Sequence, residues 1–483
     1  MKDYTDRSKT QLVRMLVEKY DFSADPRLVQ EIYRAGINIH PVVKFKGSID
    51  AGITKLQEYD ADMHPVMNKA IYPDMVTSKG LQPVTRVTLD FIKLAVKRMT
   101  ELCCGIPVKR VYKPENDKQK EIAAYLEAIY DKNRIDSVNI ERCNMLFAGC
   151  EVMTLWYAVE QKNNIYGFDS PLKLRCRNFS PMNGDALYPL FDENGDLIAL
   201  SVGYSRKKVD KLENFFDTYT SERHIKWKKI DTGWTEVENE AITLEKIPAV
   251  YMSRPTPIWE KTAKSVYEME WALSRNGNYL RENSKPLFVV FADEAIQYGD
   301  EKGANEEFKA VMQYPQGSTA QYITWQQAVD NLKFYTEQLR SLFFTQLQLP
   351  DWSYEKMSQQ ALSGESRKQM FIDAQLKVKD ESGRLLEFFT RETNVIKAFL
   401  SAILGKSYTK DIEALKIETI ITPFTIEDEK DTIDNLITAN GGRPLLSHRD
   451  SIELFGHSDD VDTTLKEIAE QDNADMDAEK PEL

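Results

Sequence analysis

LPDWSYEKMSQQALSGESRKQM, from Leu349 to Met370, interrupts the longest helical region of this chain. The stretch contains Pro350, the aromatic Trp352 and two serines that flank Gly364, and its apolar residues lack helical spacing. On both sides, apolar residues recur three and four positions apart, which is the pattern of amphipathic helices. The sequence therefore predicts two helices joined by a sizeable polar loop.

The segments around this loop predict an elongated element. Helices are expected at Ile258–Asn283 and Ala328–Leu347, with strand patterns "PLFVVFADEAI" and "STAQYITW" between them. After the loop, helical spacing continues from Ser366 to Leu404, about 58 Å if unbroken at ~1.5 Å per residue. Gly383 is a candidate bend in this helix. One helix thus leads to a small strand module and another returns from it. We call these helices, together with the long helix after the loop, the spine; compact enzyme domains seldom need such an element.

The N-terminal half predicts helices followed by a sheet. Helical spacing occurs in "QLVRMLVEKY", "TLDFIKLAVKRMTEL" and "KQKEIAAYLEAIY", whereas "CCGIPVKRVY" reads as a strand and "VNIERCNMLFAGCEVMTLWYAV" changes from helix to strand near Gly149. From Lys173 to Tyr251, alternating apolar residues separated by turn signals predict a sheet. The fold class expected is α+β.

One acidic turn within the sheet region resembles a calcium-binding loop. Asp192, Asn194 and Asp196 have the spacing of the first ligands, but strand residues follow and no glutamate stands at the twelfth position. We therefore prefer a hairpin turn between two strands.

Composition indicates a folded soluble protein. The 483 residues suffice for about three domains, and 42% hydrophobic with 29% charged residues is an ordinary globular balance. The five cysteines lack C-x-x-C pairing, which favours a reducing compartment over disulfides or structural zinc. The first twenty residues lack a signal-peptide h-region, and no apolar run reaches the ~18 residues of a membrane span.

The formal charge of −13 is concentrated in the last 27 residues. Residues 457–483 contain ten acidic residues and two lysines, a balance of −8. We prefer a solvated acidic tail to a dedicated site for a basic partner, which stays the alternative.

The sequence contains no recognisable catalytic or cofactor motif. The five histidines are scattered without metal-ligand spacing, and "SGES" around Ser363 lacks the frame of a nucleophile elbow. Walker A, dinucleotide-binding and His-Glu-x-x-His patterns do not occur. We expect no enzyme activity, no cofactor and no metal. Carboxylates are too abundant to locate a site, so a metal-dependent nucleic-acid enzyme stays an unmotivated alternative.

Several blocks, taken in order, resemble the SPP1-like bacteriophage portal family between about Asp60 and Leu404. "YDADMHPVMNKAIYPD" and the helix that ends in Gly-Ile-Pro are similar to the opening of the portal wing. "NFSPMNGDALYPLFDENGDLIALSVGYSR" looks like the family's strand pair, and "KIPAVYMSRPTPIWEKTAKSVYEMEWALSRNGNYLRENSKPLFVVF" resembles its passage from wing through stem to clip. The resemblance lies in the succession of these blocks in the family's order.

The loop at Leu349 is the strongest local match. In the family, a Pro-Asp-x-Ser … Ser-Gly-x-Ala segment follows the second stem helix and forms the tunnel loop. Glu365-Ser366 replace the usual apolar-Ala pair here, which affects the first turn of the next helix rather than the loop. The resemblance assigns these residues to the tunnel loop and DNA channel: Pro350, Asp351, Trp352, Ser353, Tyr354, Glu355, Lys356, Met357, Ser363 and Gly364. Trp352 and Tyr354 could touch DNA, but we prefer packing against the preceding helix.

The resemblance also implies a division of the chain into portal parts. The ranges are wing 1–257, stem helix 258–283, clip 284–327, second stem helix 328–348, tunnel loop 349–364, long wing or channel helix 365–406, helical crown 407–456 and acidic tail 457–483. Clip residues Glu294, Tyr298, Glu301 and Lys302 are candidates for partner contact, with a solvated loop equally favoured.

What the resemblance implies for function is a dodecameric ring at one capsid vertex of the virion, assembled in the host cytoplasm. The ring would conduct double-stranded DNA without sequence preference during packaging and ejection. It would bind the large terminase, a head-tail adaptor and the major capsid protein, with scaffolding protein left open, and no membrane. Because long amphipathic helices can pack between subunits, we expect the spine to lack a complete core in the monomer. The alternative in the same class is a virion adaptor or scaffold without a channel.

Overall fold

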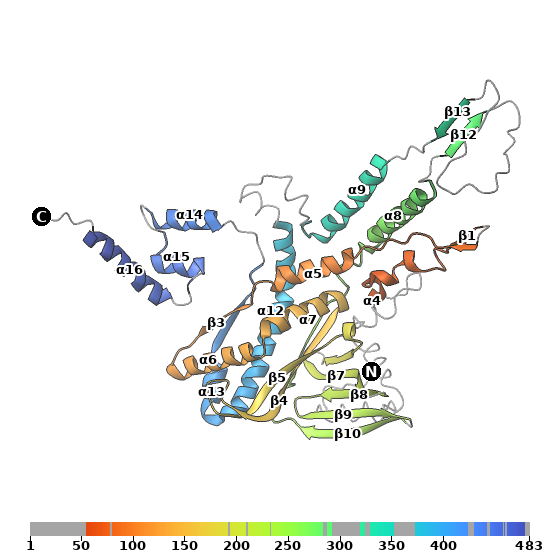
Figure 1. Cartoon of the computed structure of the whole chain (residues 1–483). Coiled ribbons are helices and arrows are strands. Elements are labelled where there is room, and N and C mark those ends of the chain that lie inside the picture. The colour runs from red at the N-terminus through yellow and green to blue at the C-terminus, as the bar shows by residue number, and fades with distance from the viewer. Residues whose placement is uncertain are drawn as a thin grey trace, which may run out of the picture.

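The computed structural model describes residues 55–77, 80–191, 194–208, 211–231, 233–283, 287–291, 319–323, 329–351, 372–423, 429–441, 445–456, 458 and 461–478. A body of helices and sheets carries a two-helix projection with a strand pair at its far end (Figure 1). The helix predicted at "QLVRMLVEKY" lies outside the described residues.

Four helices form one layer of the body: α5 (Phe91–Cys104), α6 (Asp117–Lys132), α7 (Ile135–Gly149) and α12 (Ile372–Leu404). In α5, Ile92, Val96 and Met99 are buried on one face, as their spacing predicts. The Asn116 side chain caps α6 by accepting the Gln119 N–H at 2.8 Å. All four helices confirm the sequence prediction, and α12 runs unbroken through Gly383.

A three-stranded antiparallel sheet lies against this layer in the order β11-β4-β5, comprising β4 (Glu151–Asn163), β5 (Ser170–Phe179) and β11 (Ala249–Ser253). The predicted change from helix to strand falls at Gly149 and Cys150, where Cys150 has a φ of 66° and its N–H donates to the Leu146 carbonyl at the end of α7. Buried Trp156 and Phe147 belong to the same core as Phe388 and Phe389 of α12.

The second sheet has five antiparallel strands in the order β10-β9-β8-β7-β6. Its strands are β6 (Ala186–Phe191), β7 (Leu197–Lys208), β8 (Lys211–Tyr219), β9 (Arg223–Ile230) and β10 (Gly233–Ala241). Phe191 pairs with Leu197, so β6 and β7 form the predicted hairpin, with Gly195 at a φ of 86° in its turn. Asp192 lies outside the described residues.

The projection consists of α8 (Ala263–Asn283) and α9 (Val329–Leu347), which lie side by side and carry β12 (Leu287–Phe291) paired with β13 (Thr319–Ile323) (Figure 1). Both strands and both helices were predicted. Helix α8 begins at Ala263 rather than Ile258, because the preceding residues form turns in which Thr262 N–H donates to Trp259 O at 2.9 Å.

The C-terminal part contains α13 (Lys406–Ala414), β14 (Lys416–Ile420), α14 (Glu429–Asn440), α15 (His448–Phe455) and α16 (Val461–Ala478). Strand β14 pairs with β3 (Lys109–Lys113), within the segment that the sequence assigned to the wing. The start of the crown at residue 407 stays a prediction. Ser447 caps α15 reciprocally with Asp450, and most of the acidic tail forms α16.

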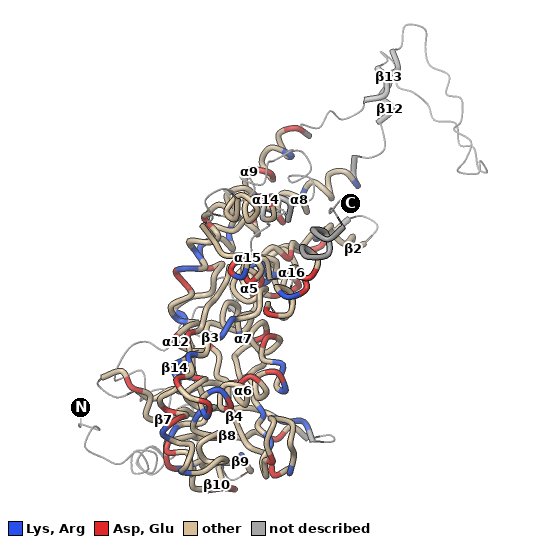
Figure 2. The backbone as a smooth tube through the Cα atoms, turned by 90° about the vertical axis from the view of Figure 1, so that its left-hand side faces the viewer, with Lys and Arg blue, Asp and Glu red and all other residues tan. Residues whose placement is uncertain are grey.

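The remaining elements lie beside α8 or the turns before it: α4 (Lys55–Glu58), the short 3-10 helices η1 (Ala61–Met63) and η2 (Pro65–Met67), and the hairpin β1 (Met75–Thr77) with β2 (Gly80–Gln82). A third 3-10 helix, η3 (Pro181–Asn183), joins the two sheets. Figure 2 shows basic and acidic positions interspersed along the body.

The expectation that the whole spine lacks a core in the monomer is wrong for the long helix. Helix α12 buries Val378, Leu385, Ile396 and Leu400 against its own chain. The physical reason is that α12 contacts both α5 and the β11-β4-β5 sheet, which together cover its apolar stripe.

Candidate functional site

The start of the predicted tunnel loop is held by two arginines. The Asp351 carboxylate accepts a hydrogen bond from Arg340 Nη2 at 3.0 Å, and Arg340 Nε lies 2.9 Å from its other oxygen. Arg98 of α5 donates to the Pro350 carbonyl at 2.7 Å, and its Nη1 lies 3.8 Å from Asp351. The Asp351 side chain is 9% exposed, so water is largely excluded from its contacts with the two arginines. We call Arg98, Arg340, Pro350 and Asp351 the loop clamp.

The turn before the clamp ends α9 sharply. Gln348 adopts a left-handed backbone with φ of 54°, and Leu349 N–H donates back to Phe344 O at 3.1 Å. Pro350 then prevents further helix. The Arg98 guanidinium lies 4.8 Å from the Phe344 ring, which adds a cation–π contact. Burial lowers the pKa of Arg98 and nearby Asp351 raises it, with a net decrease.

Helix α12 also contacts the end of α9. Lys377 Nζ donates to the Leu347 carbonyl at the end of α9. Burial and, secondarily, the charge of Arg254 lower the pKa of Lys377 to about 8. Arg254 in turn pairs with Glu381 of α12 at 2.8 Å. Helices α5, α9 and α12 therefore anchor the point at which the chain leaves the projection.

The middle of α12 is joined to the sheet by a buried ion pair. Arg142 of α7 donates to both Glu392 oxygens at 2.6 and 2.8 Å, and Trp156 Nε1 donates to Glu392 at 3.0 Å. Arg142 and Glu392 are both fully buried. Burial lowers the pKa of Arg142, but the Glu392 carboxylate outweighs it and the net shift is upward. The two hydrogen bonds of this pair, together with the Trp156 contact, set the position of α12 against β4.

The projection, in contrast, leaves large apolar side chains exposed. Phe334 is 64% exposed and Leu342 is 48% exposed on α9, and Leu280 is 51% exposed on α8. Within the projection, Tyr335 donates to Glu268 at 3.1 Å and links the two helices. At its base, Phe343, Phe344 and Leu347 are buried in the main core. The apolar side chains at the base of the projection are therefore buried within the chain. Those of the outer part of α8 and α9, which we call the shaft, are not.

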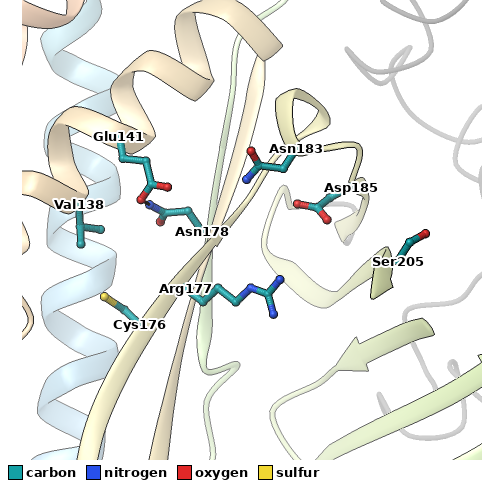
Figure 3. Close-up of a pocket in the computed structure, with 8 residues that line it drawn as sticks. All are labelled: Val138, Glu141, Cys176, Arg177, Asn178, Asn183, Asp185 and Ser205. Carbon is teal, nitrogen blue, oxygen red and sulfur yellow. Dashed lines mark hydrogen bonds between the residues drawn. The ribbon is translucent and has the colours of Figure 1, made fainter. Parts of the chain in front are cut away.

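A polar pocket of about 400 Å³ opens between α7, β5, η3 and β7 (Figure 3). Its lining residues are Val138, Glu141, Cys176, Arg177, Asn178, Asn183, Asp185 and Ser205. The Asn178 amide donates to Glu141 at 2.8 Å and accepts from the Thr154 hydroxyl at 2.7 Å. Asp185 accepts the Ser180 N–H at 3.1 Å, and burial raises the pKa of this carboxyl.

The pocket residues do not form an activated nucleophile. The Ser205 hydroxyl donates to Asn214 at 2.7 Å, which is no general base. Burial raises the pKa of Cys176 to about 12, so the thiolate is disfavoured. Within the described ranges, no group of three or more His, Cys, Asp or Glu is placed to hold a metal ion. No described helix is long and apolar enough to cross a membrane.

Of the predicted site residues, Pro350 and Asp351 are described and meet at the clamp. The other tunnel-loop and clip candidates lie outside the described residues, namely Trp352, Ser353, Tyr354, Glu355, Lys356, Met357, Ser363, Gly364, Glu294, Tyr298, Glu301 and Lys302. Sequence reasoning missed the role of Arg98 and Arg340. The available signal was Arg98 itself, a charged residue at the buried spacing of α5 beside Ala95 and Leu102.

Comparison with protein-family models matches residues 52–478 to the family described as phage portal protein, SPP1 Gp6-like. The chain belongs to this phage portal protein family. The family is structural rather than enzymatic, and the mixed helix and strand content of the chain agrees with the predicted α+β class. No curated protein matches the chain.

Solved structures of gene transfer agent (GTA) particles are similar to this portal-family chain at low identity. A chain of the neck of an empty GTA particle, computed with C6 symmetry, has a TM-score of 0.39 and 11% identity. A chain from the virion of a native GTA particle has 0.36 and 9%, and one from the native neck, computed with C12 symmetry, has 0.35 and 11%. Each match covers 76% of this chain and 88% of the other.

Proposed function

We propose that this portal-family chain assembles into a dodecameric ring at one capsid vertex of a phage virion. The ring is the channel for packaging and ejection of double-stranded DNA. Family membership over residues 52–478 is the first support. The chain itself carries no ATP-hydrolysing role, and assembly takes place in the host cytoplasm.

The observation that carries the ring proposal is the unfinished surface of the projection. The body has a continuous apolar core, yet Leu280, Phe334 and Leu342 are about half or more exposed along α8 and α9. Each such side chain gains roughly 1.5–3 kcal/mol when fully removed from water. Because α8 and α9 each face solvent with part of their apolar surface, copies of the projection can cover one another around an axis.

The loop clamp supports a channel role for the following segment. Arg98 and Arg340 fix Asp351 at the point where the chain leaves α9, so the loop starts from a rigid base. The net charge of −13 suits a conduit, because many Lys or Arg contacts would hold DNA through counterion release. Loop residues from Trp352 to Gly364 are the proposed channel segment, with Trp352 and Tyr354 packing rather than gripping DNA.

The proposed partners dock at the two ends of the projection and body. The large terminase and later a head-tail adaptor bind the clip, with Glu294, Tyr298, Glu301 and Lys302 as candidate contacts. The wing and crown face the major capsid protein, with scaffolding protein left open. These assignments follow from the family's parts and the position of β12 and β13 at the far end of the projection (Figure 1).

Negative-stain electron microscopy of the purified chain tests the ring. We expect rings with an axial hole, and Phe334→Asp combined with Leu342→Asp should convert them to monomers because two carboxylates would be buried at each contact. Phe334→Leu keeps the side chain apolar and should keep the rings. Monomers of the wild-type chain at every concentration would refute the proposal.

Two alternatives make different predictions in the same experiments. A virion adaptor or scaffold would oligomerise without an axial hole. A metal-dependent nucleic-acid enzyme would cleave DNA in a divalent-metal-dependent manner, which a simple nuclease assay detects. Unlike the portal role, the second alternative has no supporting cluster among the residues that the structure describes.

A further inference from the structure

An extended strap, residues 84–89, runs along one face of α8. Its alternate backbone N–H groups donate to side chains spaced four apart on that helix: Leu89 to Glu270 at 2.8 Å, Val87 to Ser274 at 2.9 Å and Thr85 to Asn278 at 2.5 Å. Two residues of extended chain rise about 6.6 Å and four helical residues rise about 6 Å, so the two repeats keep in step. Side chains of α8 therefore accept the N–H groups of the strap, as the backbone carbonyls of a neighbouring strand would.

Glu270, the first rung of this ladder, also binds a buried histidine. His64 Nδ1 lies 2.7 Å from Glu270 Oε1, and His64 Nε2 lies 2.8 Å from the Glu58 carbonyl oxygen. The two side chains are 1% and 0% exposed. Among the described residues, His64 is the only ion-pair partner of Glu270, and no described group donates to Glu270 Oε2.

The bonding partners fix how many protons this pair holds. A carbonyl oxygen can only accept, so His64 Nε2 carries a hydrogen. The same reasoning applies to Nδ1, because an ionised Glu270 Oε1 can only accept. The short Nδ1–Oε1 contact therefore requires one more proton, on the ring or on the carboxyl. A neutral histidine beside an ionised glutamate would set two lone pairs against each other.

The surrounding groups favour retention of this proton. Burial lowers the pKa of His64. The hydrogen bond and charge of Glu270, the hydrogen bond to the Glu58 carbonyl and the charge of Asp90 together raise this pKa by more, so the net shift is upward. Glu58 is itself a buried carboxyl that accepts from Trp259, and the Tyr267 ring packs edge-on at 5.1 Å. A raised pKa means that the stabilisation is complete at low pH and is lost as pH rises through the folded-state value.

We propose that His64 and Glu270 form a proton-dependent latch that fastens the strap, and with it the segment containing η1 and η2, to stem helix α8. Loss of the shared proton leaves the buried Glu270 carboxylate without a charge partner among the described residues and sets its Oε1 against the lone pair of His64 Nδ1. The strap then separates from α8 while the core of the body stays folded. The latch couples the position of the stem to the protonation of one histidine.

Hydrogen exchange of the full chain, measured by mass spectrometry on peptides that cover the strap, tests the latch. After correction for intrinsic exchange, strap protection should be constant at low pH. It should fall about tenfold per pH unit where the closed form holds the proton and the open form has released it, and should level off once the closed form also loses the proton. Glu270→Gln should abolish this slope, because a neutral amide can donate to Nδ1 without titrating. His64→Gln is the second variant and should also abolish it.

The matched control is Glu268→Gln, an exposed position of the same helix whose partner is Tyr335. It should keep the wild-type slope. Peptides from α6, which packs on α7 and α13, should show no slope in any variant. Strap protection that is independent of pH up to about 10, or an equal slope in wild type and Glu270→Gln, would overturn the latch.

Discussion

Removal of the Asp351 charge should destabilise the protein through the loop clamp. In Asp351→Asn, Arg98 and Arg340 lose their shared carboxylate, although the side chain keeps its size. The Arg98 and Asp351 side chains are 9% exposed, and breaking a buried pair costs about 3–5 kcal/mol. Arg340 is 32% exposed and regains some hydration, so we expect a loss of about 2–3 kcal/mol of unfolding free energy.

Urea-induced unfolding of wild type and variants measures this loss. Glu337→Gln, an exposed carboxyl on α9, is the control and should change the unfolding free energy by less than about 0.5 kcal/mol. A double-mutant cycle of Asp351→Asn with Arg340→Gln should give a coupling of at least about 1 kcal/mol. The reasoning fails if Asp351→Asn behaves like the control, or if the two substitutions are additive.

Three further predictions follow from the same anatomy. Glu392→Gln should cost about 3–5 kcal/mol in urea unfolding, because it leaves Arg142 fully buried without its charge partner; an effect near zero would show that α12 does not depend on the pair. Deletion of Trp352–Gln360 should leave rings intact in electron microscopy and impair DNA packaging, whereas loss of assembly would mean that the segment is structural. The pKa of Lys377 is lowered to about 8, so the unfolded chain binds more protons above that pH and this residue makes stability rise between about pH 8 and 10.5. The unfolding free energies of wild type and Lys377→Met should be measured across this pH range. The difference between them should rise with pH, and a difference that does not change with pH would contradict the prediction.

Much of the local structure could be predicted from the sequence because its causes are local. The apolar spacing of α5, the stop at Gly105, the cap at Ser447 and the strand patterns of β12 and β13 all depend on neighbouring residues. The interruption at Leu349 was also predictable, because Pro350 and the loss of helical spacing lie in the stretch itself.

Tertiary structure alone decided which distant residues meet. The sequence places Arg98 and Asp351 about 250 positions apart, and Arg142 and Glu392 equally far, so no periodicity could pair them. It also could not show that α12 finds its core within the chain while the shaft of α8 and α9 does not. An amphipathic pattern specifies that a face must be covered, whereas the path of the whole chain determines what covers it.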